Sequence, residues 1–288
     1  MSKKKILVLG STGLIGHQIY NYLKILEKYD LYNFSYRKKL QDDSFIIDAR
    51  NEKQFFDNIY EISPDIIINC IGILINGANT DPENAIFLNA YLPHKLRKFS
   101  DKVGAKLVHI STDCVFSGKK AAPYLEDDYK DGIDIYSKTK SLGEIIYENH
   151  LTLRTSVVGP ELKADGEELF HWFMCQSKSI KGYSKSIWSG VTTLELAKAV
   201  NCAIEKNISG LHHVTNNQSI NKYELLMIFK KYTQKDINII KIDGKKTDKS
   251  FIDTRQMLDY RIPSYDEMIF EMVNLIKKEH KLYSQYLS

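Results

Sequence analysis

The sequence predicts an α/β protein built on a doubly wound parallel sheet. Short apolar runs, typical of strands, alternate with amphipathic segments, typical of helices, and the first apolar run ends at a glycine-rich loop. Continuous apolar runs indicate strands that are buried on both faces of a parallel sheet, and strand–helix–strand alternation indicates right-handed crossovers.

The elements follow in a regular order. Residues 5–9 form a β-favouring apolar run, and the amphipathic residues 15–26 after it predict a helix. The alternation then repeats through the first half of the chain. We expect further strands at residues 31–36, 45–47, 65–70, 107–111 and 151–154, and further helices at residues 51–62, 82–100 and 135–149.

Composition excludes several classes of protein. The 288 residues, 43% of them hydrophobic, can bury a core of one large or two joined domains. The formal charge of +4, without a long block of like charges, predicts no nucleic-acid partner. No apolar run reaches the length of a membrane span, and the one near the N-terminus is too short for a signal peptide, so we expect a cytoplasmic protein. The four cysteines lack metal-ligand spacing, and we expect no metal.

A glycine-rich loop joins the first strand to the first helix, with the pattern Gly-x-x-Gly-x-x-Gly over residues 10–16. Glycines at this position allow the backbone to approach a pyrophosphate, and the free amides of the helix start favour the same anion. The sequence therefore predicts a dinucleotide site. The expected contacts in the loop are Gly10, Thr12, Gly13, Leu14, Ile15 and Gly16.

The end of the second strand indicates which dinucleotide binds. NAD-selective proteins usually carry an acidic residue about 20 positions after the glycines, but this chain has Arg37, followed by two lysines. Arg37 could pair with a 2′-phosphate, so NADP(H) is favoured; NAD(H) stays open because a solvated basic turn would look the same. Asp48, at the end of the third strand, could bind the adenine amino group or cap the next helix.

A Tyr-x-x-x-Lys pair, Tyr136 and Lys140, opens the helix after the fifth strand. Residues four apart share a helix face, so we expect the Lys140 ammonium beside the Tyr136 hydroxyl. A neighbouring ammonium lowers the pKa of a phenol and makes it a better proton donor to a forming alkoxide. Thr112 ends the fifth strand at the edge where ligands of such sheets bind, and its hydroxyl could bind the same substrate oxygen. The group suits reduction of a carbonyl.

Together these motifs resemble the extended short-chain dehydrogenases, and among them most of all the dTDP-4-dehydrorhamnose reductase family. The resemblance runs from residue 5 to roughly residue 270. Besides the glycine loop and the Tyr136/Lys140 pair, it rests on Asn69-Cys70-Ile71-Gly72, Asn89-Ala90-x-x-Pro93, Ser111-Thr112-Asp113-x-Val115-Phe116, Gly143-Glu144, Leu153-Arg154-Thr155-Ser156 and Trp188-Ser189-Gly190-Val191-Thr192-Thr193.

The resemblance implies a role for each of these groups. Thr112 and Tyr136 would polarise a keto oxygen, and Lys140 would also hold the nicotinamide ribose while NADPH gives the hydride. The implied reaction is reduction of the 4-keto group of a dTDP- or UDP-linked 6-deoxy or N-acetyl-6-deoxy hexose, for a surface polysaccharide. Cys70 and Gly72 are expected beside the cofactor, and Asp113 beside the substrate.

The chain departs from this family at Cys114, where the rhamnose-type reductases usually have a tyrosine. The related GDP-fucose synthases carry an acid–base cysteine two residues after the catalytic hydroxyl, as Cys114 follows Thr112. Cys114 as base and His171 as acid could therefore epimerise C3, the carbon beside the ketone, before reduction. A buried thiol and a packing histidine would explain the same residues.

The second half of the chain has a less regular pattern. We assign residues 1–160 to a Rossmann-type dinucleotide-binding domain and residues 161–288 to a small, mostly helical substrate-binding cap, interleaved with the last sheet elements. In the cap, Lys181 and Arg255 are candidates for the substrate diphosphate and Trp188 for sugar contact, and each could equally be structural. Helices are expected at residues 169–176, 193–205 and 222–231, and a basic linker at residues 241–249.

Two other functions stay open. A regulatory subunit of methionine adenosyltransferase resembles the same reductases, so a non-catalytic dinucleotide-binding subunit is one alternative. A nucleotide-sugar epimerase that retains its NAD is the other. The intact Thr112, Tyr136 and Lys140 favour the reductase, and by resemblance alone the protein could form a homodimer through helices.

Overall fold

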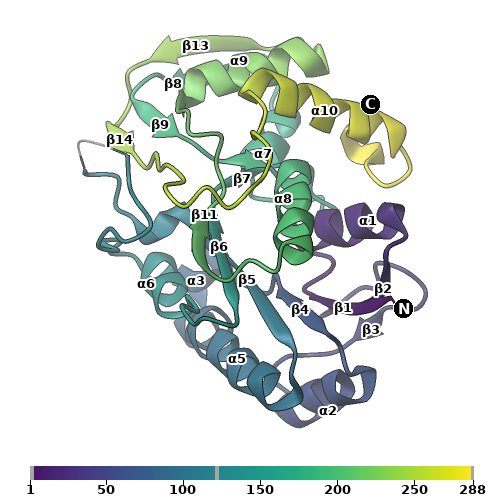
Figure 1. Ribbon diagram of the computed structural model, residues 1–288. Helices are drawn as coiled ribbons and strands as arrows, with labels where there is room; N and C mark the ends of the chain where they lie inside the picture. The colour runs from purple at the N-terminus through teal and green to yellow at the C-terminus, as the bar shows by residue number, and fades with distance from the viewer. Residues whose placement is uncertain (1–2, 121–122, 287–288) are drawn as a thin grey trace.

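The computed structural model describes residues 3–120 and 123–286. At its centre lies a seven-stranded parallel sheet with the strand order β11-β6-β5-β4-β1-β2-β3 (Figure 1). Because β1 lies inside the sheet and the chain moves outward on both sides of it, the predicted doubly wound parallel sheet is confirmed. The strands are β1 (Lys4–Leu9), β2 (Tyr29–Ser35), β3 (Phe45–Ile46), β4 (Ile66–Asn69), β5 (Lys106–Thr112), β6 (Leu151–Thr155) and β11 (Gly210–His213).

The first strand shows why the apolar runs are continuous. Ile6 and Val8 pack into the core on one face of the sheet, Leu7 and Leu9 pack into the core on the other, and all four are fully buried. Helices α1 (Gly16–Leu26) and α8 (Thr193–Glu205) cover the first face. Helices α2 (Glu52–Ile62) and α5 (Leu92–Val103) cover the second.

Two predicted helices differ in the structure. The helix expected at residues 82–100 consists of α4 (Pro82–Ala85), a π-helical segment (Ile86–Tyr91) and α5. The helix expected at residues 135–149 ends early, as α6 (Ile135–Leu142). Gly143 follows as the C-cap residue, and a Cβ there would lie 1.9 Å from the Asn89 carbonyl oxygen in the π-helical segment, so only glycine permits this close approach.

The cap contains more strand than predicted. Its helices are α7 (Leu169–Cys175), α9 (Lys222–Thr233) and α10 (Tyr265–Lys278), of which the sequence did not predict α10. Short strands form the pairs β13-β8 and β10-β7 and the three-stranded sheet β12-β9-β14. Their bounds are β7 (Val157–Val158), β8 (Ser179–Tyr183), β9 (Ser186–Trp188), β10 (Val191–Thr192), β12 (Ile220–Asn221), β13 (Asn238–Ile242) and β14 (Thr247–Asp248).

The last short elements are α3 (Ile75–Thr80) and the 3-10 helices Asp113–Val115 and Ser284–Tyr286. Although α8 and β11 come after residue 160, they belong to the central sheet and its helical layer, and the domain boundary at 160 stays a prediction. Among the described residues, no helix is long and apolar enough to cross a membrane.

Candidate active site

The glycine loop turns tightly between β1 and α1. Gly10 has a φ of +78°, and its carbonyl oxygen accepts a hydrogen bond from the Gly13 amide at 3.0 Å. A Cβ at Gly16 would lie 2.2 Å from that same oxygen, so the loop closes only with glycine there. The N-cap residue of α1 is Ile15, whose apolar side chain cannot accept a hydrogen bond from the first amides of the helix. Of the amides in the first turn, that of His17 donates to the Gly13 carbonyl at 3.2 Å, and the others are available to an anion such as a diphosphate.

The loop lies against the end of the neighbouring strand. A Cβ at Gly10 would lie 3.0 Å from the backbone of Cys70, the residue that follows β4. Gly72 lies next to Asn89, whose carboxamide binds both the amide and the carbonyl of Ile73, at 2.9 and 3.1 Å. The structure therefore places Cys70 against the glycine loop and Gly72 close behind it.

Two guanidinium groups flank one aromatic ring where the 2′-phosphate was expected. The guanidinium carbons of Arg37 and Arg50 lie 5.2 and 5.4 Å from the centre of the Tyr36 ring. Arg50 also forms an ion pair with Asp48 at 2.7 Å, which lowers the pKa of that carboxyl. Asp48 does not cap α2, because Asn51 does. Sequence reasoning missed Arg50, although it follows Asp48 by only two residues.

The two hydroxyls predicted to be catalytic meet at the carboxyl end of β5. Thr112 ends the strand, and its hydroxyl accepts a hydrogen bond from the Cys114 amide at 3.1 Å and donates one to Asp113 at 3.2 Å. Tyr136 lies in the first turn of α6, whose start is capped by Asp134. The Thr112 hydroxyl is close enough to Tyr136 to oppose the rise in the pKa of its phenol. The structure thus brings together the two hydroxyls predicted to bind one substrate oxygen.

The electrostatics of the Tyr136/Lys140 pair correct one expectation. Burial raises the pKa of Tyr136, and the neighbouring Cys114 raises it further, whereas Lys140 was expected to lower it. The Lys140 ammonium instead donates to the Ile110 carbonyl at 2.8 Å, and burial lowers the pKa of Lys140 to about 8. Tyr136 is therefore a protonated phenol at neutral pH, which is the form that can donate a proton.

Cys114 and Asp113 lie at the same strand end, and burial favours the protonated form of both. Burial raises the pKa of the Cys114 thiol to about 11, so the thiol is protonated at neutral pH. Burial likewise raises the pKa of Asp113. Lys249 and Lys222, two cap lysines that sequence reasoning missed, oppose this shift at Asp113.

The expected acid His171 does not lie at this cluster. Its Nδ1 is hydrogen-bonded to the Tyr286 hydroxyl at 2.6 Å, and its Nε2 to the Ala164 carbonyl at 3.2 Å. Both ring nitrogens are thus used in the interior of the cap, and this geometry does not support the predicted acid role. The structure supports the alternative of a packing histidine.

Three other cap residues were candidates for substrate contacts. Two of them make contacts within the protein, and the third is exposed on the surface. Trp188 is 7% exposed, and its ring lies 5.6 Å from that of Tyr265, so it packs in the core. Arg255 donates to the Leu211 carbonyl at 2.6 Å and pairs with Asp127 at 2.7 Å, which fixes the end of β11. Lys181 is exposed on β8, where the alternate residues face inward.

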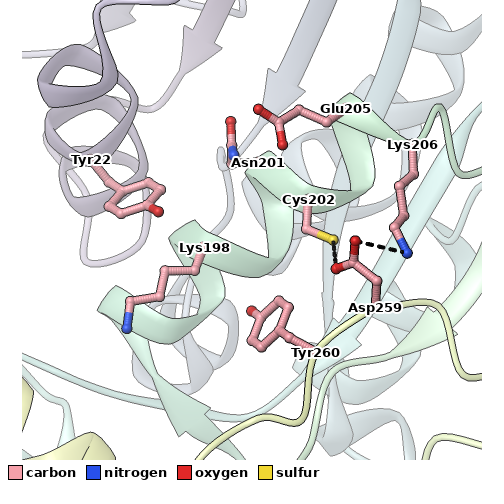
Figure 2. Close-up of a pocket in the computed structure, with 8 residues that line it drawn as sticks. All are labelled: Tyr22, Lys198, Asn201, Cys202, Glu205, Lys206, Asp259 and Tyr260. Carbon is pink, nitrogen blue, oxygen red and sulfur yellow. Dashed lines mark hydrogen bonds and ion pairs between the residues drawn. The ribbon is translucent and has the colours of Figure 1, made fainter.

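A pocket of about 420 Å³ lies between α1, α8 and the loop before α10, and it shares no lining residue with the catalytic cluster (Figure 2). Its charged groups are engaged with protein: Asp259 accepts from the Cys202 thiol at 3.3 Å and pairs with Lys206 at 3.3 Å. We assign this pocket no role. It is lined by Tyr22, Lys198, Asn201, Cys202, Glu205, Lys206, Asp259 and Tyr260.

The parallel sheet, the glycine loop and the Thr112/Tyr136/Lys140 group define an extended short-chain dehydrogenase. More specifically, the chain belongs to the family described as RmlD substrate binding domain, whose model matches residues 4–251. The resemblance found in the sequence is confirmed.

Individual relatives agree with this family. The chain is 29% identical over 225 residues to the spore coat polysaccharide biosynthesis protein SpsK of Bacillus subtilis (strain 168), covering 76% of each chain. It is 30% identical over 158 residues to dTDP-4-dehydrorhamnose reductase of Escherichia coli (strain K12), a match that covers 53% of this chain and about half (51%) of the relative. The crystal structure of dTDP-4-dehydrorhamnose reductase from Bacillus anthracis str. Ames in complex with NADP has a TM-score of 0.82 and 25% identity, covering 95% of this chain and 100% of that one.

Proposed function

We propose that this protein reduces the 4-keto group of a dTDP- or UDP-linked 6-deoxy or N-acetyl-6-deoxy hexose, with NADPH as the reductant. The observation that carries the proposal is the meeting of Thr112 and Tyr136 at the carboxyl end of β5, with the buried Lys140 tied to the same strand. The relatives named dTDP-4-dehydrorhamnose reductase, one of them in complex with NADP, support the same chemistry.

The residues of the glycine loop fit a dinucleotide. Gly10 and Gly16 leave room only for backbone, so a diphosphate can approach the free amides at the start of α1. The Arg37 guanidinium is offered to a 2′-phosphate, and the Arg50 guanidinium, bonded to Asp48 and to the Tyr36 hydroxyl, adds a second positive charge beside the same ring, which favours NADPH over NADH. Bound NADPH supplies the hydride of the reaction.

The chain's own groups supply the proton. As C4 of the sugar gains the hydride, its oxygen becomes an alkoxide and takes the proton of the Tyr136 phenol, so the ketone becomes a secondary alcohol. Burial keeps that phenol protonated until then. Thr112 must turn its single proton from Asp113 to the substrate oxygen, which the long 3.2 Å bond to Asp113 permits. The buried Lys140 cation stabilises the phenolate that remains.

Epimerisation beside the ketone receives less support than reduction. A proton abstraction at C3 needs a base, and the Cys114 thiol is protonated because burial raises its pKa to about 11. Inversion at C3 also needs an acid on the opposite face of the sugar. The candidate for this acid was His171, whose ring nitrogens bind Tyr286 and Ala164. We therefore propose reduction without epimerisation.

A homodimer is part of the proposal. Exposed apolar side chains gather where α5 meets α6 and the residues after it: Leu142 is 68% exposed and Ile146 59%. The two helices touch there, since His94 of α5 binds the Leu142 carbonyl at 2.7 Å. We expect the wild type to sediment as a dimer and the Leu142→Lys variant to sediment as a monomer.

The reductase proposal is tested with purified protein, NADPH and a panel of 4-keto-6-deoxy sugars on dTDP and UDP. We expect absorbance loss at the NADPH band with one of the sugars, and loss of this activity in Tyr136→Phe. If calorimetry shows that NADPH binds but no sugar of the panel causes its oxidation, the result would instead favour a non-catalytic, nucleotide-binding subunit. An NAD that stays bound through purification, with no net reduction, would favour an epimerase.

A further inference from the structure

A lysine of the cap reaches the catalytic end of β5. Lys249 follows β14, which pairs with β9 so that Asp248 lies opposite Ile187. The Asp248 amide donates to the Gly118 carbonyl at 3.0 Å, which ties this segment to the loop just after the catalytic residues. The Lys249 stem packs over that loop, because a Cβ at Gly118 would lie 3.0 Å from its Cγ.

The backbone on the other side of Lys249 is fixed as well. The Tyr124 amide donates to the Ser250 carbonyl at 2.8 Å, and the Ile252 amide donates to the Tyr124 carbonyl at 3.1 Å. The Ser189 hydroxyl accepts from the Phe251 amide at 2.8 Å. Lys249 is therefore presented from a segment anchored on both sides, so its direction is a property of the fold.

The Lys249 ammonium has unused hydrogen-bonding capacity. Its surroundings are the Cys114 thiol, a weak acceptor, and the carboxylates of Asp113 and Asp134, and these groups raise its pKa. Among the described residues, no carboxylate lies within 4 Å of it as an ion pair. An ammonium carries three donors, and a partly buried one is stabilised by stronger acceptors than a thiol.

The position of this cation indicates which part of a substrate it meets. Thr112 and Tyr136 bind the oxygen on C4 in the proposed reaction, and Cys114 follows Thr112 by two residues. Because the Cys114 amide donates to the Thr112 hydroxyl at 3.1 Å, we assign a substrate group that lies against Cys114 and Lys249 to a carbon next to C4. Of the two neighbouring carbons, C5 carries the methyl group and the ring oxygen, whereas C3 carries the free hydroxyl.

We propose that Lys249 donates a hydrogen bond to the oxygen substituent on C3 and selects nucleotide-linked 4-keto sugars that carry such an acceptor. This inference rests on the proposed function, because it uses C4 reduction to orient the sugar. Lys249 thus determines specificity. It belongs to the cap, whereas Thr112, Tyr136 and Lys140 belong to the sheet and its helices.

The test compares two substrates that differ only at C3: a dTDP-linked 4-keto-6-deoxyhexose and its 3-deoxy counterpart. The variants are Lys249→Met, which keeps the length of the side chain but removes the charge, Lys249→Arg, which keeps a cation, and Lys246→Met, an exposed lysine of the same segment, as the control. Thermal unfolding of each variant verifies that it is folded.

We expect Lys249→Met to lower kcat/KM about tenfold to a hundredfold for the 3-hydroxy sugar, as for loss of a hydrogen bond to a charged group, and to leave the 3-deoxy sugar nearly unchanged. Lys249→Arg should retain part of the preference, and Lys246→Met all of it. An equal loss on both sugars overturns the inference, because it would mean a general or structural effect.

The two proposals fail in different ways. If the wild type oxidises NADPH with neither sugar, the reductase proposal fails, and calorimetric affinities for the same two sugars then decide the role of Lys249. A preference for the 3-hydroxy sugar that disappears in Lys249→Met supports it. Equal affinities of the wild type for the two sugars overturn it.

Discussion

The Lys140 ammonium donates a hydrogen bond to the backbone carbonyl of Ile110, 2.8 Å away. Ile110 lies on β5, two residues before Thr112, so the buried cation is tied to the strand that carries the catalytic hydroxyl. Burial lowers the pKa of Lys140 to about 8. Lys140 therefore changes its charge in a pH range that experiments can reach.

Lys140 should make the protein more stable as the pH rises from 8 to 10. Folded Lys140 loses its proton near pH 8 while the unfolded chain keeps its proton up to about 10.5, so the cost of burying the charge is relieved in this window. We expect a gain of roughly 2 kcal/mol in the free energy of unfolding. Urea denaturation at both pH values should show this gain in the wild type and in Lys138→Met, an exposed neighbour, but not in Lys140→Met. An equal gain in all three proteins would rule the explanation out.

Gly16→Ala should abolish dinucleotide binding. The new Cβ would lie 2.2 Å from the Gly10 carbonyl oxygen, so the loop must open and the amides at the start of α1 must move. We expect a loss of more than about tenfold in NADPH affinity and a cost of about 1–3 kcal/mol in stability. Gly104→Ala is the control, because its φ of +72° makes alanine strained although no atom lies within 4 Å of the new Cβ. The Gly104→Ala variant should lose stability but keep its affinity for NADPH. If Gly16→Ala also kept its affinity for NADPH, the assignment of the glycine loop to the dinucleotide site would be contradicted.

Arg50→Met and Arg37→Met should each weaken NADPH binding by about tenfold, as for loss of one charge-assisted hydrogen bond. Binding of NADH should change little, because NADH lacks the 2′-phosphate. Calorimetry with both nucleotides measures the difference, and Lys38→Met is the control for general charge. If both nucleotides weaken equally, the two guanidinium groups do not read the 2′-phosphate.

His171→Phe should lower stability without lowering kcat. The variant removes the hydrogen bonds of the ring to the Tyr286 hydroxyl, which keeps its contacts with the Glu161 backbone, and to the Ala164 carbonyl, at a cost of about 1–3 kcal/mol. We expect kcat within about twofold of the wild type, since the ring does not reach the catalytic cluster. A folded variant with a much lower kcat would restore the acid role that the sequence suggested.

The sheet and the cofactor loop were predictable because their signals are local. The apolar run of β1 must be buried on both faces, and the spacing of Gly10, Gly13 and Gly16 has meaning only between a strand and a helix. Thr112 and Tyr136 were found for a similar reason, since each follows a strand or opens a helix at the same sheet edge. The side chains that meet at that edge could be named before their distances were known.

The cap and the detailed electrostatics depend on contacts between distant residues. His171 binds Tyr286, 115 residues later, and Gly143, just after α6, approaches the backbone of Asn89 closely. Lys249 reaches Cys114 only because two-residue and three-residue strands pair in one register, and strands this short leave no periodic signal. The raised pKa of Tyr136 follows from burial, which the Tyr-x-x-x-Lys spacing does not reveal.

Transfer of deuterium from NADPH to the sugar tests the central claim most directly. NADPH deuterated on each face of nicotinamide C4 in turn is incubated with the protein and the 4-keto sugar that it consumes, a parallel reaction uses unlabelled NADPH in D2O, and the products are examined by NMR. We predict one deuterium on C4 of the sugar from one of the two faces, none from solvent on C3, and no product with Tyr136→Phe. Oxidised NADPH with no deuterium on C4, or equal turnover by Tyr136→Phe, would contradict the account.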